Sequence, residues 1–149
     1  MRALLQRVSR AAVRVEGEEI GRIGAGLLIL LGVASEDRPG LEEKLAIRCA
    51  GLRIFEDERG RMNLSVRDIG GAVLVVPQFT LVADTSRGRR PSFTPTAPPD
   101  RAERAFQAFC ETLRAVDVPT ERGRFGVSME VELTNMGPAT FLLESASGS

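Results

Sequence analysis

The fold is decided by the stretch AVLVVPQFTL, residues 72–81. Its first five residues, 72–76, are all apolar, which predicts a central strand buried on both faces. Pro77 then stops the strand, and Gln78 and Thr80 come next with an amide and a hydroxyl. Strand ends suit ligand binding, because the sheet fixes the backbone and leaves N–H groups free. The segment is therefore either a site or a simple strand stop in which Thr80 caps the next segment of the chain.

Further strands are predicted on both sides of this stretch. Residues 2–15 alternate loosely, which predicts an edge or half-buried strand, and the apolar run 27–33 predicts a buried one. Residues 122–125, 128–133 and 140–143 also have strand character. The glycines between Gly21 and Gly26 lack the strand-to-helix context of a phosphate-binding loop, which favours hairpin turns.

Two helices complete the predicted fold. Residues after Pro39-Gly40 place Leu41, Leu45, Cys49 and Leu52 on one side, and residues 100–116 carry an apolar stripe at helical spacing. Two helices among many strands indicate an α+β protein. We expect a single domain over residues 1–145, with a strongly curved, barrel-like, mostly antiparallel sheet and two main helices, and a short flexible tail at 146–149.

The composition excludes several kinds of chemistry. The chain has no histidine, which excludes Ser-His-Asp and Cys-His catalysis and the common zinc sites. Its one lysine, Lys44, lies on the polar side of a predicted helix, and its two cysteines fall on apolar helix stripes. We expect no metal and no cofactor. The net charge is zero, so a nucleic-acid site would have to be local.

The expected location is the cytoplasm. No apolar run approaches the roughly 20 residues that a membrane helix needs. The N-terminal residues MRALLQRVSR lack the continuous apolar core and cleavage site of a secretory signal. We therefore expect no contact with a membrane.

Two other segments stand out. In residues 135–140, NMGPAT, a glycine precedes a proline, a pair that fits an ordinary turn or an unusual backbone geometry, since only about 5–6% of X-Pro bonds are cis. Residues 85–93, TSRGRRPSF, hold Arg87, Arg89 and Arg90 beside hydroxyls and one aromatic ring. Such a run fits either a phosphate backbone or a solvated loop.

Together these segments resemble the D-aminoacyl-tRNA deacylase family. The similarity runs in order over residues 1 to about 145 and rests on these motifs: Met1-Arg2-Ala3, Gln6-Arg7-Val8-Ser9, Leu52-Arg53-Ile54-Phe55-Glu56-Asp57, Met62-Asn63-Leu64-Ser65, Gln78-Phe79-Thr80-Leu81, Gly88-Arg89-Arg90-Pro91-Ser92-Phe93, Gly123-Arg124-Phe125-Gly126 and Gly137-Pro138.

The resemblance implies the family's fold and a metal-free ester hydrolysis. The reaction would release D-amino acids, and glycine mischarged on tRNA, as a proofreading step of translation. The ribose 2′-OH of the tRNA would help to activate water. Gln78, Phe79 and Thr80 would be the catalytic residues, with the backbone N–H groups of Phe79 and Thr80 stabilising the oxyanion.

The resemblance also implies partners. The protein would be a homodimer with active sites at the subunit interface, and Gly137 and Pro138 would form a cis gate that reaches into the partner's pocket. Arg7 would hold that gate. We assign Arg87, Arg89 and Arg90 to tRNA, and expect no DNA partner.

Two departures from the family pattern leave alternatives open. Pro77 replaces the serine of the first motif, and Ala139 fills the variable place of the second. A chirally relaxed subfamily shares the proline and has a trans Gly-Pro, so relaxed chirality is one alternative. A non-catalytic RNA-binding module is another, although the chain has no Trp or Tyr for stacking. A ligand-binding regulator with the same fold is the third.

Overall fold

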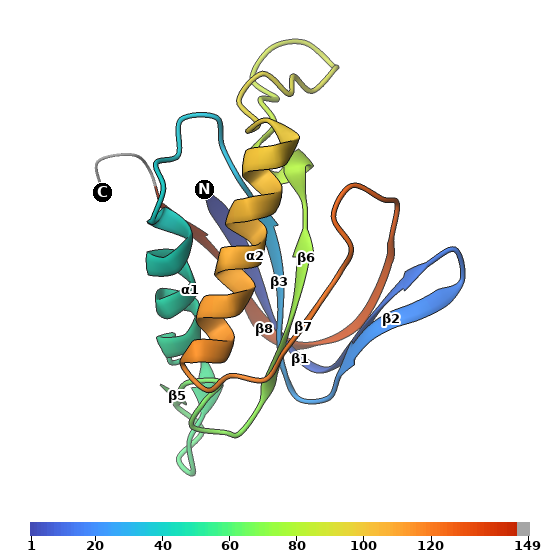
Figure 1. The fold of residues 1–149 in the computed structure, drawn as a ribbon. Helices are drawn as coiled ribbons and strands as arrows, with labels where there is room; N and C mark the ends of the chain where they lie inside the picture. Colours follow the sequence, from blue (N-terminus) through green and yellow to red (C-terminus); the bar gives the residue numbers. More distant parts are fainter. Residues whose placement is uncertain (146–149) are drawn as a thin grey trace.

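The computed structural model describes residues 1–145, so the expected tail at 146–149 lies outside the described residues. In chain order the elements are β1 (Arg2–Val15), β2 (Glu18–Ile23), β3 (Gly26–Gly32), α1 (Leu41–Gly51), β4 (Phe55–Glu56), β5 (Met62–Leu64), β6 (Ala72–Pro77), the 3-10 helix η1 (Phe79–Val82), α2 (Pro99–Ala115), β7 (Thr120–Arg122) and β8 (Glu130–Glu144) (Figure 1).

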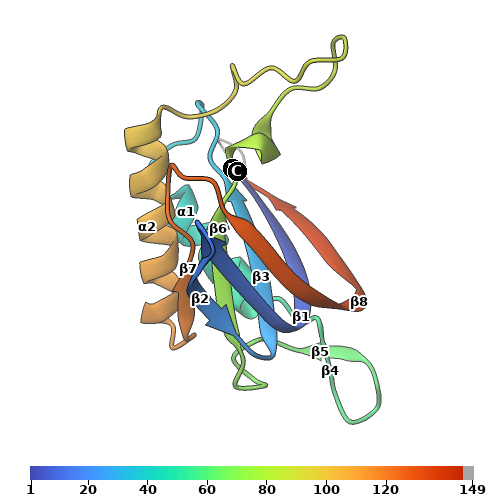
Figure 2. The same ribbon diagram turned by 90° about the vertical axis from the view of Figure 1, so that its right-hand side faces the viewer.

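The long strand β1 organises the main sheet. It pairs antiparallel with β3 along its first half, with β2 along its second half, and with β8 along nearly its whole length. β3 pairs in parallel with β6, and β6 in parallel with β7. β2 also lies against β6 and β7, so the sheet curves strongly toward a barrel (Figure 2). The predicted α+β class, with its barrel-like sheet and two main helices, is confirmed.

The structure decides between the two alternatives for residues 2–15, an edge strand or a half-buried one, in favour of the half-buried strand. β1 is not an edge strand, because β8 occupies one side of it and β2 and β3 the other. Its loose alternation of polar and apolar residues reflects one buried face and one more exposed face. Alternation of polar and apolar residues shows which face of a strand is buried. It does not show whether another strand pairs along either of its edges.

β6 is the central strand that its sequence predicts, buried on both faces. Val73 and Val75 point into a core beneath the two helices, whereas Leu74 and Val76 point into a second core enclosed by the curved sheet. β6 thus joins the two cores, and its end at Pro77 lies at the rim of both.

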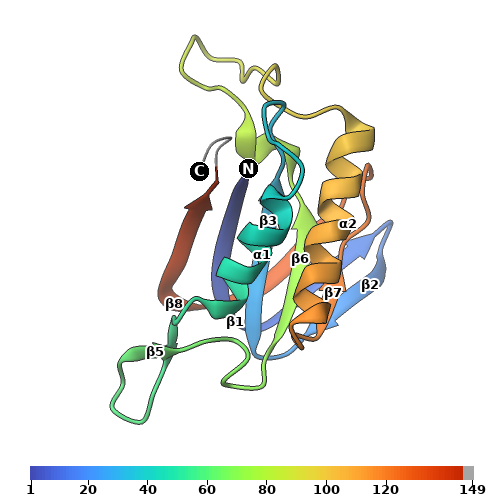
Figure 3. The ribbon, with the colours of Figure 1, turned by 60° about the vertical axis from the view of Figure 1, so that its left-hand side comes forward.

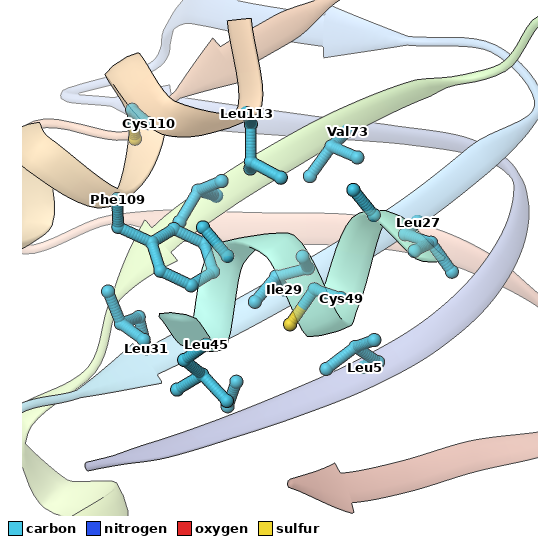
Figure 4. Close-up of a cluster of buried hydrophobic side chains, with 14 of the residues drawn as sticks. Leu5, Leu27, Ile29, Leu31, Leu45, Cys49, Val73, Phe109, Cys110 and Leu113 are labelled. Atoms are coloured by element: carbon cyan, nitrogen blue, oxygen red, sulfur yellow. The ribbon is translucent and has the colours of Figure 1, made fainter. Parts of the chain in front are cut away.

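The two helices lie side by side over one face of the sheet (Figure 3). α2 buries most of the predicted stripe, with Phe109 and Leu113 fully inside, next to Leu45 of α1 and Ile29 of β3 (Figure 4). No helix within the described residues is long and apolar enough to span a membrane.

Both cysteines lie in this core, as predicted. Burial raises the pKa of Cys49 to about 12 and that of Cys110 to about 11. Both thiols therefore stay protonated at neutral pH, and neither provides a nucleophile.

The C-terminal strands differ from the prediction. The strand expected at 122–125 starts at Thr120 and ends at Arg122, after which residues 123–129 leave the sheet. The strands expected at 128–133 and 140–143 are one strand, β8, that continues through the NMGP segment. It continues because its partner β1 is long enough to resume pairing on the far side of the interruption.

We predict that Gly26→Ala strongly destabilises the fold. Gly26 has φ +157° and lies opposite Ala72 at the start of the β3–β6 ladder, where an added Cβ would overlap the carbonyl oxygen of Ala72. We expect a loss of roughly 3 kcal/mol or more in the free energy of unfolding, measured in urea. Gly24→Ala is the matched control, since a Cβ there meets nothing within 4 Å. Equal stability of the two variants would contradict the prediction.

Candidate active site

The segment after β6 is held against the sheet by backbone contacts. The Gln78 N–H donates to the Leu31 carbonyl (2.8 Å), and the Leu81 N–H donates to the Gln78 carbonyl (3.2 Å). Gly32 makes this approach possible, because a Cβ there would lie 3.0 Å from the Gln78 oxygen and 3.1 Å from the Leu81 side chain. The arrangement leaves Phe79 60% exposed and Thr80 exposed.

Two backbone donors are free at this point. Among the described residues, no hydrogen bond involves the N–H of Phe79 or of Thr80, because the first N–H groups of a helix have no acceptor within it. The Gln78 Nε2 donates to the Thr80 Oγ1 at 2.7 Å. Two adjacent free N–H groups form the type of donor pair that stabilises an oxyanion.

A cavity of about 640 Å³ lies beside this segment, within the range of roughly 300–1,000 Å³ that is typical of small-ligand sites. Its walls come from the end of β6, the start of α2 and the loop 123–129. Its walls are mostly apolar and comprise Val76, Pro77, Gln78, Phe79, Thr96, Ala97, Pro99, Ala102, Phe125, Gly126, Val127, Ser128, Met129 and Val131.

Sequence reasoning missed most of the residues that line the cavity, among them Phe125 and Met129. Gly123 lets Met129 and Pro77 approach, since a Cβ there would lie 2.8 Å from the Met129 sulfur and 3.4 Å from the Pro77 ring. The only signal in the sequence was the motif Gly123-Arg124-Phe125-Gly126, which carries no chemistry of its own. The loop becomes a pocket wall only through its contact with the end of β6.

The arginine-rich loop is closed at its base and tied to the site. Asp84 and Ser92 exchange backbone hydrogen bonds of 2.8 Å. The Asp84 carboxylate accepts hydrogen bonds from the Ser86 hydroxyl and N–H, which lower the pKa of Asp84. The Phe93 ring packs edge-on against Phe79, with centroids 5.2 Å apart. This contact anchors the loop beside the free N–H groups.

The predicted tRNA contacts lie at the tip of that loop. Arg87, Arg89 and Arg90 are exposed, and none of them forms an ion pair with another described residue. The loop projects beyond the ends of the sheet and of α2 (Figure 2). Three guanidinium groups are therefore free to meet phosphate.

Gly137 and Pro138 lie in a bulge of β8. Between the pairs Gln6–Thr140 and Val8–Asn135, the single residue Arg7 of β1 faces four residues of β8, 136–139. The Gly137-Pro138 peptide is cis, the isomer that the family resemblance implies. Both residues are exposed.

Two side chains close the bulge. Arg7 is 9% exposed, and its guanidinium donates to the Met136 carbonyl (2.9 Å) and to the Ile54 carbonyl (2.8 Å). The Asn135 Nδ2 donates to the carbonyls of Arg7 (3.1 Å) and Ala139 (3.3 Å). The role expected for Arg7 as a holder of this segment fits these contacts, and Asn135 emerges as a second holder.

Within one chain, the Gly137-Pro138 bulge lies far from the cavity beside Gln78. Pro77 of β6 pairs with Leu31 of β3, and Leu31 pairs with Ala3 of β1. The bulge of β8 lies opposite Arg7, which is four residues further along β1 than Ala3. At about 3.3 Å per residue this is about 13 Å along the strands, and three strand spacings add about 14 Å across the sheet. The structure therefore unites Gln78 with Phe79 and Thr80, and Arg7 with Gly137 and Pro138, but keeps the two groups apart.

Within residues 1–145, no group of three or more His, Cys, Asp or Glu side chains is placed to hold a metal ion. The chemistry that these residues offer consists of backbone donors, an amide, a hydroxyl and an apolar cavity.

The chain is similar to known proteins over nearly its whole length. The family model described as D-Tyr-tRNA(Tyr) deacylase matches residues 4–144. The chain is 56% identical to a D-aminoacyl-tRNA deacylase of Paracoccus denitrificans, covering 98% of both chains, and 54% identical to that of Escherichia coli, covering 97% of this chain and 99% of the relative.

A solved structure agrees. The fold matches that of a "c-Myc DNA Unwinding Element Binding Protein" with a TM-score of 0.91 and 40% identity, covering 97% of this chain and 99% of the other. The resemblance inferred from the motifs is confirmed: the chain belongs to the D-Tyr-tRNA(Tyr) deacylase family.

Proposed function

We propose that the protein hydrolyses the ester bond of D-aminoacyl-tRNA and of glycine mischarged on tRNA, releasing the free amino acid and tRNA. The observation that carries the proposal is the pair of free N–H groups at Phe79 and Thr80 beside an apolar cavity. The chain matches deacylases of this type over nearly its whole length. We assign the activity to residues 1–145 and to the cytoplasm, where charged tRNA is used.

The proposed mechanism relies on backbone groups and on the substrate. Water attacks the ester carbonyl, and the N–H groups of Phe79 and Thr80 stabilise the negative charge that develops on its oxygen. Loss of one such donor typically costs about 2.7–4 kcal/mol of transition-state stabilisation. The ribose 2′-OH assists the attacking water, and the 3′-OH leaves with a proton. This route suits a chain that has no histidine.

We place the Gly137-Pro138 bulge in the cavity of a second copy of the chain. In one chain the bulge is too far from Gln78 to act on the same substrate. Met136 and Leu142 of β8 are each 48% exposed, an apolar surface that a second copy would cover. A homodimer of this kind has two active sites at its interface, each completed by the partner.

The bulge then acts as the chiral gate. The Gly137 and Pro138 carbonyl oxygens accept hydrogen bonds from the substrate's α-ammonium, and the bulge occupies the place of an L side chain. A rigid wall is needed to exclude the L side chain by contact. The fixed φ of Pro138 and the hydrogen bond from Arg7 to the Met136 carbonyl both make the bulge rigid. Pro77, which lines the cavity, favours relaxed chirality as the second candidate function.

The arginine loop supplies contacts to the tRNA backbone. Arg87, Arg89 and Arg90 are exposed and free of ion pairs with described residues, and the loop is tied to the site through the Phe79–Phe93 contact. Phosphate contacts of this kind set position and affinity and carry no sequence information.

The reaction is tested with purified protein and matched D-aminoacyl-, L-aminoacyl- and glycyl-tRNA. We expect steady turnover of the D-aminoacyl and glycyl substrates, with the L-aminoacyl substrate spared. Equal rates on the D and L substrates would favour the relaxed-chirality function. Binding of tRNA without turnover of any substrate would identify an RNA-binding module and overturn the proposal.

The gate is tested by Pro138→Gly, which removes the fixed φ of the wall while leaving the cavity intact. We expect the rate on L-aminoacyl-tRNA, relative to the D substrate, to rise by about tenfold, equivalent to about 1.4 kcal/mol of lost discrimination. Pro39→Gly, in the exposed turn before α1, is the control and should not change selectivity. The proposal is wrong if Pro138→Gly keeps wild-type selectivity, or if the active wild-type protein is a monomer in solution.

Thr80 is predicted to act through its backbone. Its hydroxyl accepts a hydrogen bond from Gln78, and no histidine exists to activate it as a nucleophile. Thr80→Ala keeps the N–H and should retain activity within about tenfold of wild type, a loss of less than about 1.4 kcal/mol in the barrier. A folded variant that loses several orders of magnitude, or an acyl-threonine trapped on the wild type, would refute this assignment.

A further inference from the structure

A second hollow lies next to the proposed active site. It measures about 440 Å³ and runs between α2 and residues 121–125. Its walls are formed by Ile20, Glu103, Phe106, Gln107, Arg114, Glu121, Arg122, Gly123, Arg124 and Phe125. We call it the α2–β7 groove.

The groove and the active-site cavity follow each other along the same two elements. Ala102 of α2 lines the cavity, and Glu103 and Phe106, within the next turn, line the groove. On the other side Phe125 lines both hollows, so its ring forms part of the wall between them. From Ala102 to Arg114 the helix is about 18 Å long at 1.5 Å per residue. The two hollows thus form one track beside α2.

The groove carries free positive charge next to the cavity. Arg122 and Arg124 are exposed, and neither forms an ion pair with a described residue. Arg114, at the far end, donates to the Thr120 carbonyl (2.9 Å) and so has donors left over. Glu103 and Glu121 also line the groove, which reduces its net charge to about that of one arginine.

We propose that the α2–β7 groove binds the RNA strand that precedes the terminal aminoacyl-adenosine, with Arg122 and Arg124 taking its phosphates. The proposal rests on the proposed function, since it needs the terminal adenosine to occupy the neighbouring cavity. A strand that enters the cavity must leave through an opening, and the track beside α2 offers one with two guanidinium groups that form no ion pair within residues 1–145. Arg87, Arg89 and Arg90 then contact a different part of the tRNA.

The test compares two substrates of different length, full D-aminoacyl-tRNA and the D-aminoacyl ester of adenosine alone. For Arg122→Gln/Arg124→Gln, we expect kcat/KM on the tRNA to fall by at least about tenfold more than on the adenosine ester. The log–log salt slope for binding uncharged tRNA should become shallower by about 1.4, the value for two phosphates of a single strand. Equal losses on both substrates, or an unchanged salt slope, would overturn the proposal.

Controls separate a local contact from a change in net charge. Arg59→Gln/Arg61→Gln removes two exposed arginines from the β4–β5 turn and should leave both substrates unaffected. Glu103→Gln/Glu121→Gln removes the carboxylates that repel phosphate in the groove, and should strengthen tRNA binding. Weaker binding by this variant would contradict a phosphate contact at the groove.

The arginine loop provides an independent comparison. Arg87→Gln/Arg89→Gln/Arg90→Gln should also make the salt slope shallower, and its effect should add to that of the groove variant, because separate contacts are additive. Failure of the wild-type protein to hydrolyse D-aminoacyl-tRNA would defeat the proposed function itself. If the wild-type protein hydrolyses both substrates and the groove variant shows the same kcat/KM values and salt slope, only the proposed role of the groove would be disproved.

Discussion

Six residue pairs join β3 to β6 in parallel, from Gly26 opposite Ala72 to Leu31 opposite Pro77, and the other features of the molecule depend on this ladder. It separates the core beneath the helices from the core inside the curved sheet. A glycine lies at each end of β3. Gly26 permits the close approach to Ala72, and Gly32 permits η1 to lie against the sheet just beyond Pro77. The same ladder therefore supports the fold and fixes the position of the free N–H groups of Phe79 and Thr80 at the end of the sheet.

The parts of the fold that the sequence predicts are those with a local cause. Burial on both faces leaves β6 wholly apolar, and α2 carries its stripe because one side of it meets the sheet. The limits of β7 and the continuity of β8 depend on partners more than 40 residues away along the chain, so no local pattern encodes them. For the same reason the local pattern of residues 2–15 could not decide between an edge strand and a half-buried one.

The residues of the candidate site also fall into those that a local sequence signal indicates and those that depend on contacts distant in the sequence. The sequence singles out Gln78, Phe79 and Thr80 as candidates because a buried strand ends abruptly before them, a local signal, and their proposed catalytic role comes from the family resemblance. The walls Phe125 and Met129 could not be found from spacing, since they reach the cavity only where Gly123 lets the loop pack on Pro77. Nor could the sequence show that Arg7 and the Gly137-Pro138 bulge lie far from the cavity of their own chain, because that separation follows from strand register.

The closure of the bulge has a consequence for assembly. Arg7 and Asn135 tie it with hydrogen bonds made entirely within one chain, so its conformation is fixed when the chain folds. Two preorganised surfaces lose little conformational entropy on docking, whereas a loop ordered only at the interface would subtract that loss from the association free energy. In the homodimer that we propose, the two chains would therefore associate as nearly rigid bodies, with a bimolecular rate limited mainly by orientation.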